Sequence, residues 1–192
     1  NLQMSSENSE FEKDFFIKKI KESDSQIKFM SKTIDDFRDF YKVEKQTQEF
    51  SIKNACNLAI NILKPSLKKK NITINLDLKE DITILGYENE FAQVILNFLT
   101  NSLDAFNQNK QKNASINISV KKEKNKLITK VCDNAGGIKL KNIDEVFDAY
   151  FSTKIRGSGI GLYMSKLIIK EHFKGDIRAS NTKYGACFEI VI

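Results

Sequence analysis

A glycine-rich segment at residues 157–162, with the sequence Gly-Ser-Gly-Ile-Gly-Leu, is the strongest local signal of chemistry in this chain. It is predicted to open an amphipathic helix. Glycines let the backbone approach a ligand closely, and a helix N-terminus offers free N–H groups to an anion. The segment has neither the preceding strand of a dinucleotide-binding turn nor the Gly-Lys-Ser/Thr ending of a Walker loop. It therefore predicts a phosphate site of another kind, although a glycine cluster alone is not specific.

A second signal is a carboxylate at the end of an apolar strand, Asp133, which Asn134, Ala135, Gly136 and Gly137 follow. Such a carboxylate can accept a hydrogen bond from a ligand amine while the chain turns tightly around it. The alternative is a plain Asp-Asn turn in which the two glycines supply positive φ. The residues alone leave both interpretations open.

A third signal is a polar stripe on a predicted helix, formed by Asn97, Asn101 and Asp104 at steps of four and three. Apolar side chains form a separate stripe on the same helix. Two amides on a mostly buried helix need partners, because an unpaired buried amide costs about 1–3 kcal/mol. An amide oxygen is a suitable hard ligand for Mg²⁺. Helix capping or hydrogen bonding between helices is the alternative role for these amides.

The element that precedes these groups is expected to be one long helix over residues 8–45. No glycine or proline interrupts it, and its apolar residues alternate at steps of four and three in a heptad pattern broken only by Ser23. Further apolar residues beside this pattern, such as Phe15 and Phe40, favour packing in a helical bundle.

The remaining chain is expected to form one α+β domain. The predicted elements are a strand at 50–51, a helix at 52–63, strands at 72–76 and 82–84, a helix at 89–108, a hairpin of strands 116–120 and 127–132 joined through a charged turn, a loop-rich stretch at 133–157, a helix at 158–173, and strands at 176–180 and 186–192. This order predicts a two-layer α/β sandwich with a mixed, mainly antiparallel sheet and helices on one face. We expect one domain at residues 1–46 and a second at 47–192.

The composition narrows the choice of partners. The net charge of +6 comes almost entirely from lysines interleaved with acids, since only Arg38, Arg156 and Arg178 are arginines, and this pattern predicts no nucleic-acid partner. No apolar run reaches the ~20 residues of a membrane span, so we expect a cytoplasmic chain without membrane contact. The three cysteines are far apart and odd in number, which predicts buried, reduced thiols without a zinc site or a disulfide framework.

Together and in this order, the three groups resemble the N, G1 and G2 boxes of histidine kinases and the wider GHKL ATPase superfamily. Residues 93–105 resemble the N box, residues 133–138 the G1 box, and residues 157–162 the G2 box. Phe-Asp-Ala-Tyr-Phe-Ser-Thr-Lys at 147–154 resembles the F box, and Ala135 stands where many members carry Gly. The likeness covers residues 50–192. Residues 30–41 resemble the second helix of a dimerisation and histidine-phosphotransfer hairpin, which indicates a sensor histidine kinase of a two-component system.

This resemblance implies a site for ATP and Mg²⁺. It implies that Asp133 accepts the adenine amino group, that Asn101 binds Mg²⁺, that Asn97 supports the water shell of the metal, and that Lys154 meets the γ-phosphate from a lid at 143–156. The other residues that it places at the nucleotide are Asp104, Gly136, Gly137, Ile138, Tyr150, Phe151, Thr153, Arg156, Gly157, Ser158, Gly159, Ile160, Gly161 and Leu162.

The resemblance also implies a phosphoacceptor histidine on an upstream helix, a homodimer formed through the hairpin, and a response regulator as partner. The only histidine, His172, lies at the end of the last predicted helix and does not match the position of that phosphoacceptor. We therefore expect this chain to lack its own acceptor because it was cut after the upstream helix that carries it; a parent protein without such a histidine is the alternative. The parent protein can then be a membrane-anchored sensor. The alternatives are a GHKL serine kinase or ATPase, and a non-catalytic nucleotide-binding module that dimerises.

Overall fold

The computed structural model describes residues 15–17, 19–20, 23–24, 27, 47–109, 111, 113–154 and 157–192. The chain divides into two units, Asn1–Glu44 and Lys45–Ile192. All described residues of the first unit are α-helical, in agreement with the predicted leading helix. Residues 30–41, which carry the resemblance to a dimerisation helix, lie outside the described residues.

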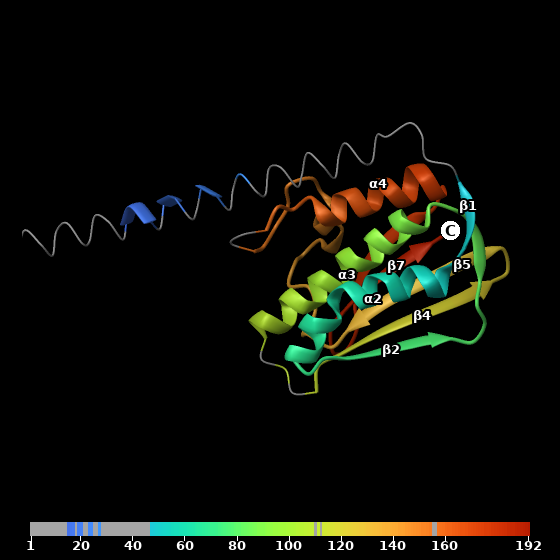
Figure 1. Ribbon diagram of the computed structural model, residues 1–192, viewed down its shortest axis with the longest axis horizontal. Helices are drawn as coiled ribbons and strands as arrows, with labels where there is room; N and C mark the ends of the chain where they lie inside the picture. Colours follow the sequence, from blue (N-terminus) through green and yellow to red (C-terminus); the bar gives the residue numbers. More distant parts are fainter. Residues whose placement is uncertain are drawn as a thin grey trace, which may run out of the picture. The chain divides into compact units, whose positions relative to one another are not determined.

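The second unit is built on a five-stranded sheet in the order β2-β4-β5-β7-β6 (Figure 1). Its strands are β2 (Thr73–Leu78), β4 (Ser115–Glu123), β5 (Lys126–Asp133), β6 (Asp176–Asn181) and β7 (Ala186–Val191). The β2–β4 pair is parallel, and the other neighbouring pairs are antiparallel. The predicted mixed, mainly antiparallel sheet is therefore confirmed.

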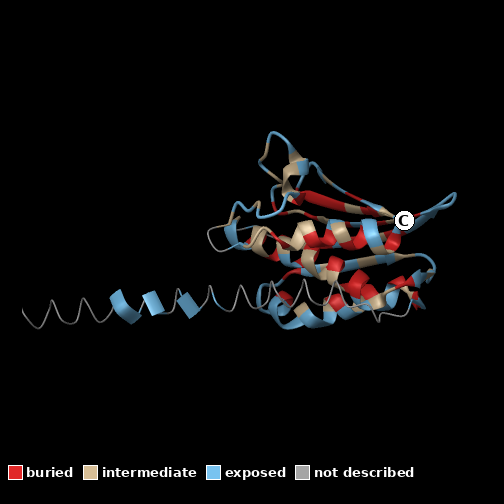
Figure 2. Ribbon diagram, turned by 90° about the horizontal axis from the view of Figure 1, so that it is seen from above, coloured by how far each residue is buried: buried red, intermediate tan, exposed pale blue. Residues whose placement is uncertain are grey.

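Three helices cover one face of this sheet: α2 (Ile52–Lys69), α3 (Glu88–Gln108) and α4 (Gly161–Phe173) (Figure 1). Figure 2 shows buried residues gathered where the helical layer meets the strands. On α3, the predicted apolar stripe of Phe91, Val94, Ile95 and Phe98 is fully buried, and each of these side chains contributes about 1.5–3 kcal/mol to stability. The ring of Phe98 stacks on Phe188 of β7 with centroids 4.9 Å apart. This packing fixes α3 against the sheet.

A second, two-stranded sheet lies beside the helices and joins β1 (Gln48–Ser51) to β3 (Thr83–Gly86). Ser51 ends β1 and caps α2, because its Oγ accepts a hydrogen bond from the N–H of Asn54 at 3.1 Å. Among the described residues, no helix is both long enough and apolar enough to cross a membrane.

Two helix boundaries differ from the prediction. Helix α2 continues through Pro65 to Lys69, although its end was expected near residue 63. Proline removes one helical hydrogen bond, but the last turn still buries Leu67 at 5% exposure, and this burial offsets the loss. Helix α4 begins at Gly161 instead of Ser158, because Gly159 has a φ of +66° that an α-helix does not accept.

The prediction for the cysteines was wrong for two of the three. Cys132 of β5 and Cys187 of β7 occupy opposite positions in the antiparallel register and form a disulfide. They are 55 residues apart in the chain, and only the strand pairing brings them together. Cys56 is free and buried, as predicted, and this burial raises the pKa of its thiol to about 12, so that it stays protonated at neutral pH.

Candidate functional site

The Asp133 carboxylate, at the end of β5, is held by three hydrogen bonds. Its Oδ1 accepts from the backbone N–H groups of Ala135 at 2.9 Å and Ala186 at 3.1 Å, and its Oδ2 accepts from the Ser102 hydroxyl at 2.8 Å. A carboxylate oxygen offers about two lone-pair positions. The two backbone donors therefore fill Oδ1, whereas Oδ2 keeps one position for a further donor. Asp133 is only 7% exposed, so this acceptor is both oriented and shielded from water.

The turn after Asp133 is built by the two glycines. Gly136 has a φ of +94° and Gly137 a φ of +80°, values that favour glycine. Asn181 of β6 then fixes Ile138, accepting from its N–H at 2.7 Å and donating to its carbonyl at 2.9 Å. The two interpretations of this segment are thus compatible, since a glycine turn shapes the chain and leaves the carboxylate able to accept a ligand.

Two residues of this part of the site were missed by the sequence reasoning. Ser102 directly follows the predicted Asn101 and is 1% exposed. Its position four residues after Phe98, in line with the apolar stripe, is a weak sequence signal that its hydroxyl is buried and needs a partner. Asn181 had no signal, because its contact with Ile138 joins segments 43 residues apart.

On α3, Asn97 faces helix α4. Its Nδ2 donates to the carbonyl of Gly161 at 3.1 Å and to the hydroxyl of Ser165 at 3.0 Å. Its Oδ1 accepts from Gln93 at 3.3 Å. Hydrogen bonding between helices, the alternative considered for these amides, therefore describes the contacts of Asn97. They join α3 to the first turn of α4 beside the glycine-rich segment.

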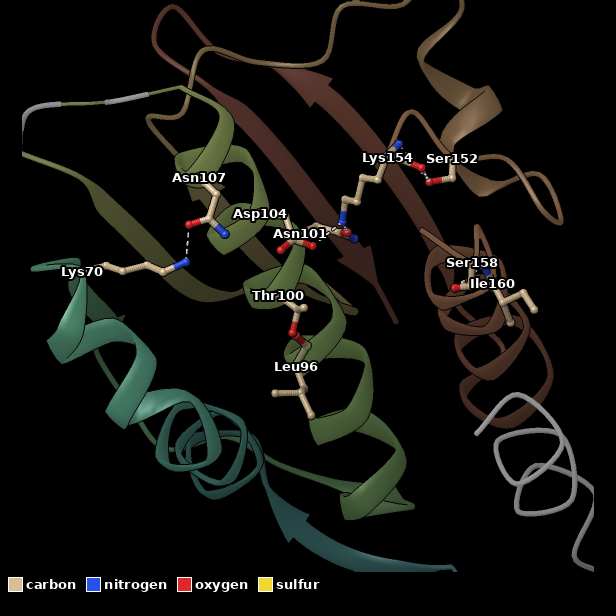
Figure 3. Close-up of polar contacts among 10 residues, drawn as sticks. All are labelled: Lys70, Leu96, Thr100, Asn101, Asp104, Asn107, Ser152, Lys154, Ser158 and Ile160. Atoms are coloured by element: carbon tan, nitrogen blue, oxygen red, sulfur yellow. Dashed lines mark hydrogen bonds and ion pairs between the residues drawn. The ribbon is translucent and has the colours of Figure 1, made fainter. Parts of the chain in front are cut away.

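One turn further along α3, Asn101 and Asp104 bind the side chain of Lys154 (Figure 3). The Lys154 ammonium donates to Asn101 Oδ1 at 2.8 Å and forms an ion pair with Asp104 Oδ2 at 2.6 Å. The Lys154 and Asp104 side chains are 32% and 38% exposed, so solvent reaches the pair. Because Ser102 lies in the same turn, this part of α3 contacts both the Asp133 carboxylate and the Lys154 ammonium.

The segment between the sheet and α4 contains a short 3-10 helix, η1 (Ile143–Phe147), whose Phe147 is buried. Beyond it the chain folds back on itself, and the N–H of Tyr150 donates to the carbonyl of Gly159 at 3.1 Å. The Tyr150 side chain is 74% exposed and faces solvent. Of the other predicted residues here, Thr153 and Gly157 are exposed, Phe151, Ser158, Gly159, Gly161 and Leu162 are half-buried, and Ile160 is buried; Arg156 lies outside the described residues.

Gly159 and Gly161 differ in whether the surrounding structure has room for a side chain. A Cβ on Gly159 would overlap the backbone of Tyr150 and Phe151, and its φ of +66° is itself unfavourable for alanine. A Cβ on Gly161 would meet nothing closer than Asn97 at 3.7 Å, an ordinary contact. The fold thus requires glycine at 159, whereas it accommodates a Cβ at 161.

We therefore expect Gly159→Ala to lower the melting temperature by about 2–8 °C, from a left-handed backbone cost of about 1–2 kcal/mol. Gly161→Ala is the matched control, and its melting temperature should equal or slightly exceed that of the parent, because alanine is the better helix former and its Cβ makes only ordinary contacts there. Thermal unfolding followed by circular dichroism measures both. Equal melting temperatures for the two variants would show that the folded-back segment relaxes around a side chain at 159.

The Asp133 carboxylate on β5 and the α3 turn that binds Lys154 both lie in the part of the chain that matches a known protein family. Residues 86–192, more than half of the chain, match the family of histidine kinase-, DNA gyrase B-, and HSP90-like ATPases. The chain belongs to this ATPase family. The family identity expected from the four boxes is confirmed, and so is the GHKL-type fold.

Several proteins that this chain resembles are named histidine kinases. The chain is 30% identical over 125 residues to sporulation kinase C of Bacillus subtilis, a match that covers 64% of this chain and 28% of that protein. The catalytic domain of histidine kinase ThkA has the same fold, with a TM-score of 0.68, 21% identity, and coverage of 77% of this chain and 95% of that one. The structure of ThkA in complex with response regulator protein TrrA matches with a TM-score of 0.67 and 19% identity, covering 86% of this chain and 48% of that one. The chain spans about a third or less of the length of the first curated relatives that it matches.

Proposed function

We propose that this chain binds ATP together with Mg²⁺ and acts as the catalytic domain of a sensor histidine kinase. Two neighbouring features carry the proposal. The Asp133 carboxylate is fixed and has one free acceptor position, and the adjacent turn of α3 binds the Lys154 ammonium. Membership of an ATPase family supports the same assignment.

At the adenine end, Asp133 Oδ2 accepts the exocyclic amino group in this proposal. The three donors that hold the carboxylate prevent it from rotating, so the amine meets an acceptor in a defined direction. Gly136, Gly137 and Ile138 then line the adenine side, because the turn that they form starts at Asp133. A base without an amino group at that position leaves Oδ2 unpaired and binds less tightly.

At the phosphate end, the oxygens of Asn101 and Asp104 suit a hard divalent cation, since the structure already shows them binding the Lys154 ammonium. When bound, Mg²⁺ neutralises phosphate charge and orients the γ-phosphoryl group. Asn97 keeps the N-terminus of α4 against α3, so that the backbone of residues 157–162 stays close to the phosphates. Lys154 and Thr153 lie on the segment that approaches the γ-phosphate, and we assign Arg156 to the same group.

The phosphoacceptor in this proposal is a histidine of an upstream helix of the dimerised kinase. The Pγ–O bond to ADP breaks, a Pγ–N bond to the imidazole forms, and the phosphoryl group then passes to an aspartate of a response regulator. His172 is not suited to this role. Its ring pairs with Glu90 and lies 5.2 Å from the Tyr87 ring, near the end of α4 and about 16 Å along the helix from Gly161.

The relatives named as sensor or sporulation kinases and the ThkA–TrrA complex support a histidine kinase with a response regulator as partner. We assign residues 1–46 to the dimerisation hairpin, residues 47–192 to the catalytic domain, and the whole to the cytoplasm, where ATP is available.

The test uses γ-labelled ATP and Mg²⁺, with this chain alone and with a version extended upstream through one further helix. We expect acid-labile, base-stable protein label on the extended version only. Acid-stable label would instead indicate a serine kinase, and release of phosphate without protein label would indicate an ATPase. Either result would refute the histidine kinase assignment and keep the nucleotide site.

A further inference from the structure

The position of the Lys154 ammonium has a consequence beyond phosphate binding. Its Nζ lies 2.8 Å from Asn101 Oδ1 and 2.6 Å from Asp104 Oδ2, and these oxygens come from one turn of α3 (Figure 3). Lys154 lies 50 residues further along the chain than Asp104, beyond strands β4 and β5 and the short helix η1. The Lys154 ammonium therefore occupies the position that another cation would take if it bound these two oxygens.

The same oxygen of Asn101 is the one assigned above to Mg²⁺, and this inference rests on that assignment. Mg²⁺ binds oxygens at about 2.0–2.1 Å with strict octahedral geometry. An ammonium and a divalent ion that share Asn101 Oδ1 would lie within a few ångströms of each other and would repel strongly. Lys154 and the metal therefore cannot both use this oxygen.

We propose that Lys154 is a built-in competitor for the metal position, a positioning residue that holds Asn101 and Asp104 until the metal–nucleotide complex binds. Lys154 then gives up Asn101 Oδ1, and its ammonium is available to the γ-phosphate that arrives with the metal when the nucleotide is ATP. The same side chain thus prearranges the metal ligands in one state and binds phosphate in the other.

The chemistry of the side chain fits this exchange. Lysine carries a compact charge on a flexible four-carbon stem, so its ammonium can move several ångströms without a change in the backbone. The side chains of Lys154 and Asp104 are about one third exposed, and ion pairs of that kind contribute little to stability. Breaking this ion pair therefore costs little free energy. Without phosphates, the displaced ammonium has no anion to bind. We therefore expect tight metal binding only in the presence of nucleotide.

Lys154→Met tests the exchange through the Mg²⁺ requirement of ADP binding. ADP has no γ-phosphate, so the expected role of Lys154 at that group does not contribute to this measurement. Titration calorimetry of ADP at a series of Mg²⁺ concentrations gives the half-saturating Mg²⁺ concentration. Removing the competitor should lower that concentration by about threefold to tenfold. A half-saturating concentration that is unchanged or raised would overturn the proposal.

Two further variants make the result specific. Lys170→Met removes the same charge from an exposed position near the far end of α4 and should leave the Mg²⁺ requirement unchanged. Lys154→Arg keeps a cation and should keep the requirement close to that of the parent; a fall equal to that of Lys154→Met would contradict competition by charge. ADP binding that depends on Mg²⁺ but not on residue 154 refutes this inference alone. No ADP binding to the parent at any Mg²⁺ concentration refutes the proposed function as well.

Discussion

Asp133→Asn should weaken ADP binding by at least about a hundredfold while the domain stays folded. The amide oxygen of asparagine can take the place of Oδ1 and keep the bonds from the Ala135 and Ala186 N–H groups. Its amide nitrogen then replaces Oδ2, and the Ser102 hydroxyl can rotate to accept from it. The adenine amine would meet a donor instead of an acceptor, and a site built around a hydrogen bond rejects a mismatched group strongly. Titration calorimetry with ADP measures the loss.

The matched control for this prediction is Asp176→Asn. Asp176 lies on β6, is exposed and pairs with Arg178 at 3.0 Å, so the same chemical change occurs away from the carboxylate on β5. ADP affinity should remain that of the parent. Circular dichroism and thermal unfolding establish that both variants are folded. Parent-like ADP affinity in folded Asp133→Asn would remove Asp133 from the site.

The sequence predicted best what depends on local periodicity. The α3 stripe of Phe91, Val94, Ile95 and Phe98 follows from 3.6-residue spacing, and the burial of all four side chains agrees with it. The β4–β5 hairpin was also predicted, although its strands run on to Glu123 and Lys126 around a two-residue turn. Alternating apolar residues at 116–120 and 127–132 fixed the inner face of both strands, and the charged turn marked their connection.

What the sequence did not reveal depends on pairing between distant segments. The register of β5 and β7 places Cys132 opposite Cys187 and brings the Ala186 N–H to Asp133, and no spacing in the chain encodes that register. The same holds for the contact between Lys154 and the α3 turn, since a resemblance that assigned Lys154 to a phosphate did not imply its binding to Asn101 and Asp104. The motifs predicted the residues of the candidate site, and only the fold showed which of them contact one another.

Asn101→Ala should remove most of the Mg²⁺ dependence of ATP binding and lower label transfer in the extended protein by about a hundredfold or more. The variant deletes the amide oxygen that we assign to the metal, and a metal that positions a transferring phosphoryl group contributes several kcal/mol to the transition state. The fold should tolerate the change, because Asn101 is half-buried and the described contact of its side chain is with the Lys154 ammonium, which keeps Asp104 as a partner. ATP affinity measured with and without Mg²⁺ gives the first effect, and acid-labile label gives the second.

Thr100→Ala is the matched control for this variant, since Thr100 precedes Asn101 on α3 and is exposed. Among the described residues, its hydroxyl donates to the carbonyl of Leu96 at 2.7 Å within the same helix (Figure 3), so its loss should leave nucleotide and metal binding unchanged. Comparison of the two variants separates the loss of a ligand from a general disturbance of the helix. Should ATP bind Asn101→Ala with the same Mg²⁺ dependence as the parent, the metal would have to be held by other oxygens. Competition by Lys154 at Asn101 would then have no basis, because the lysine and the metal would no longer share an oxygen.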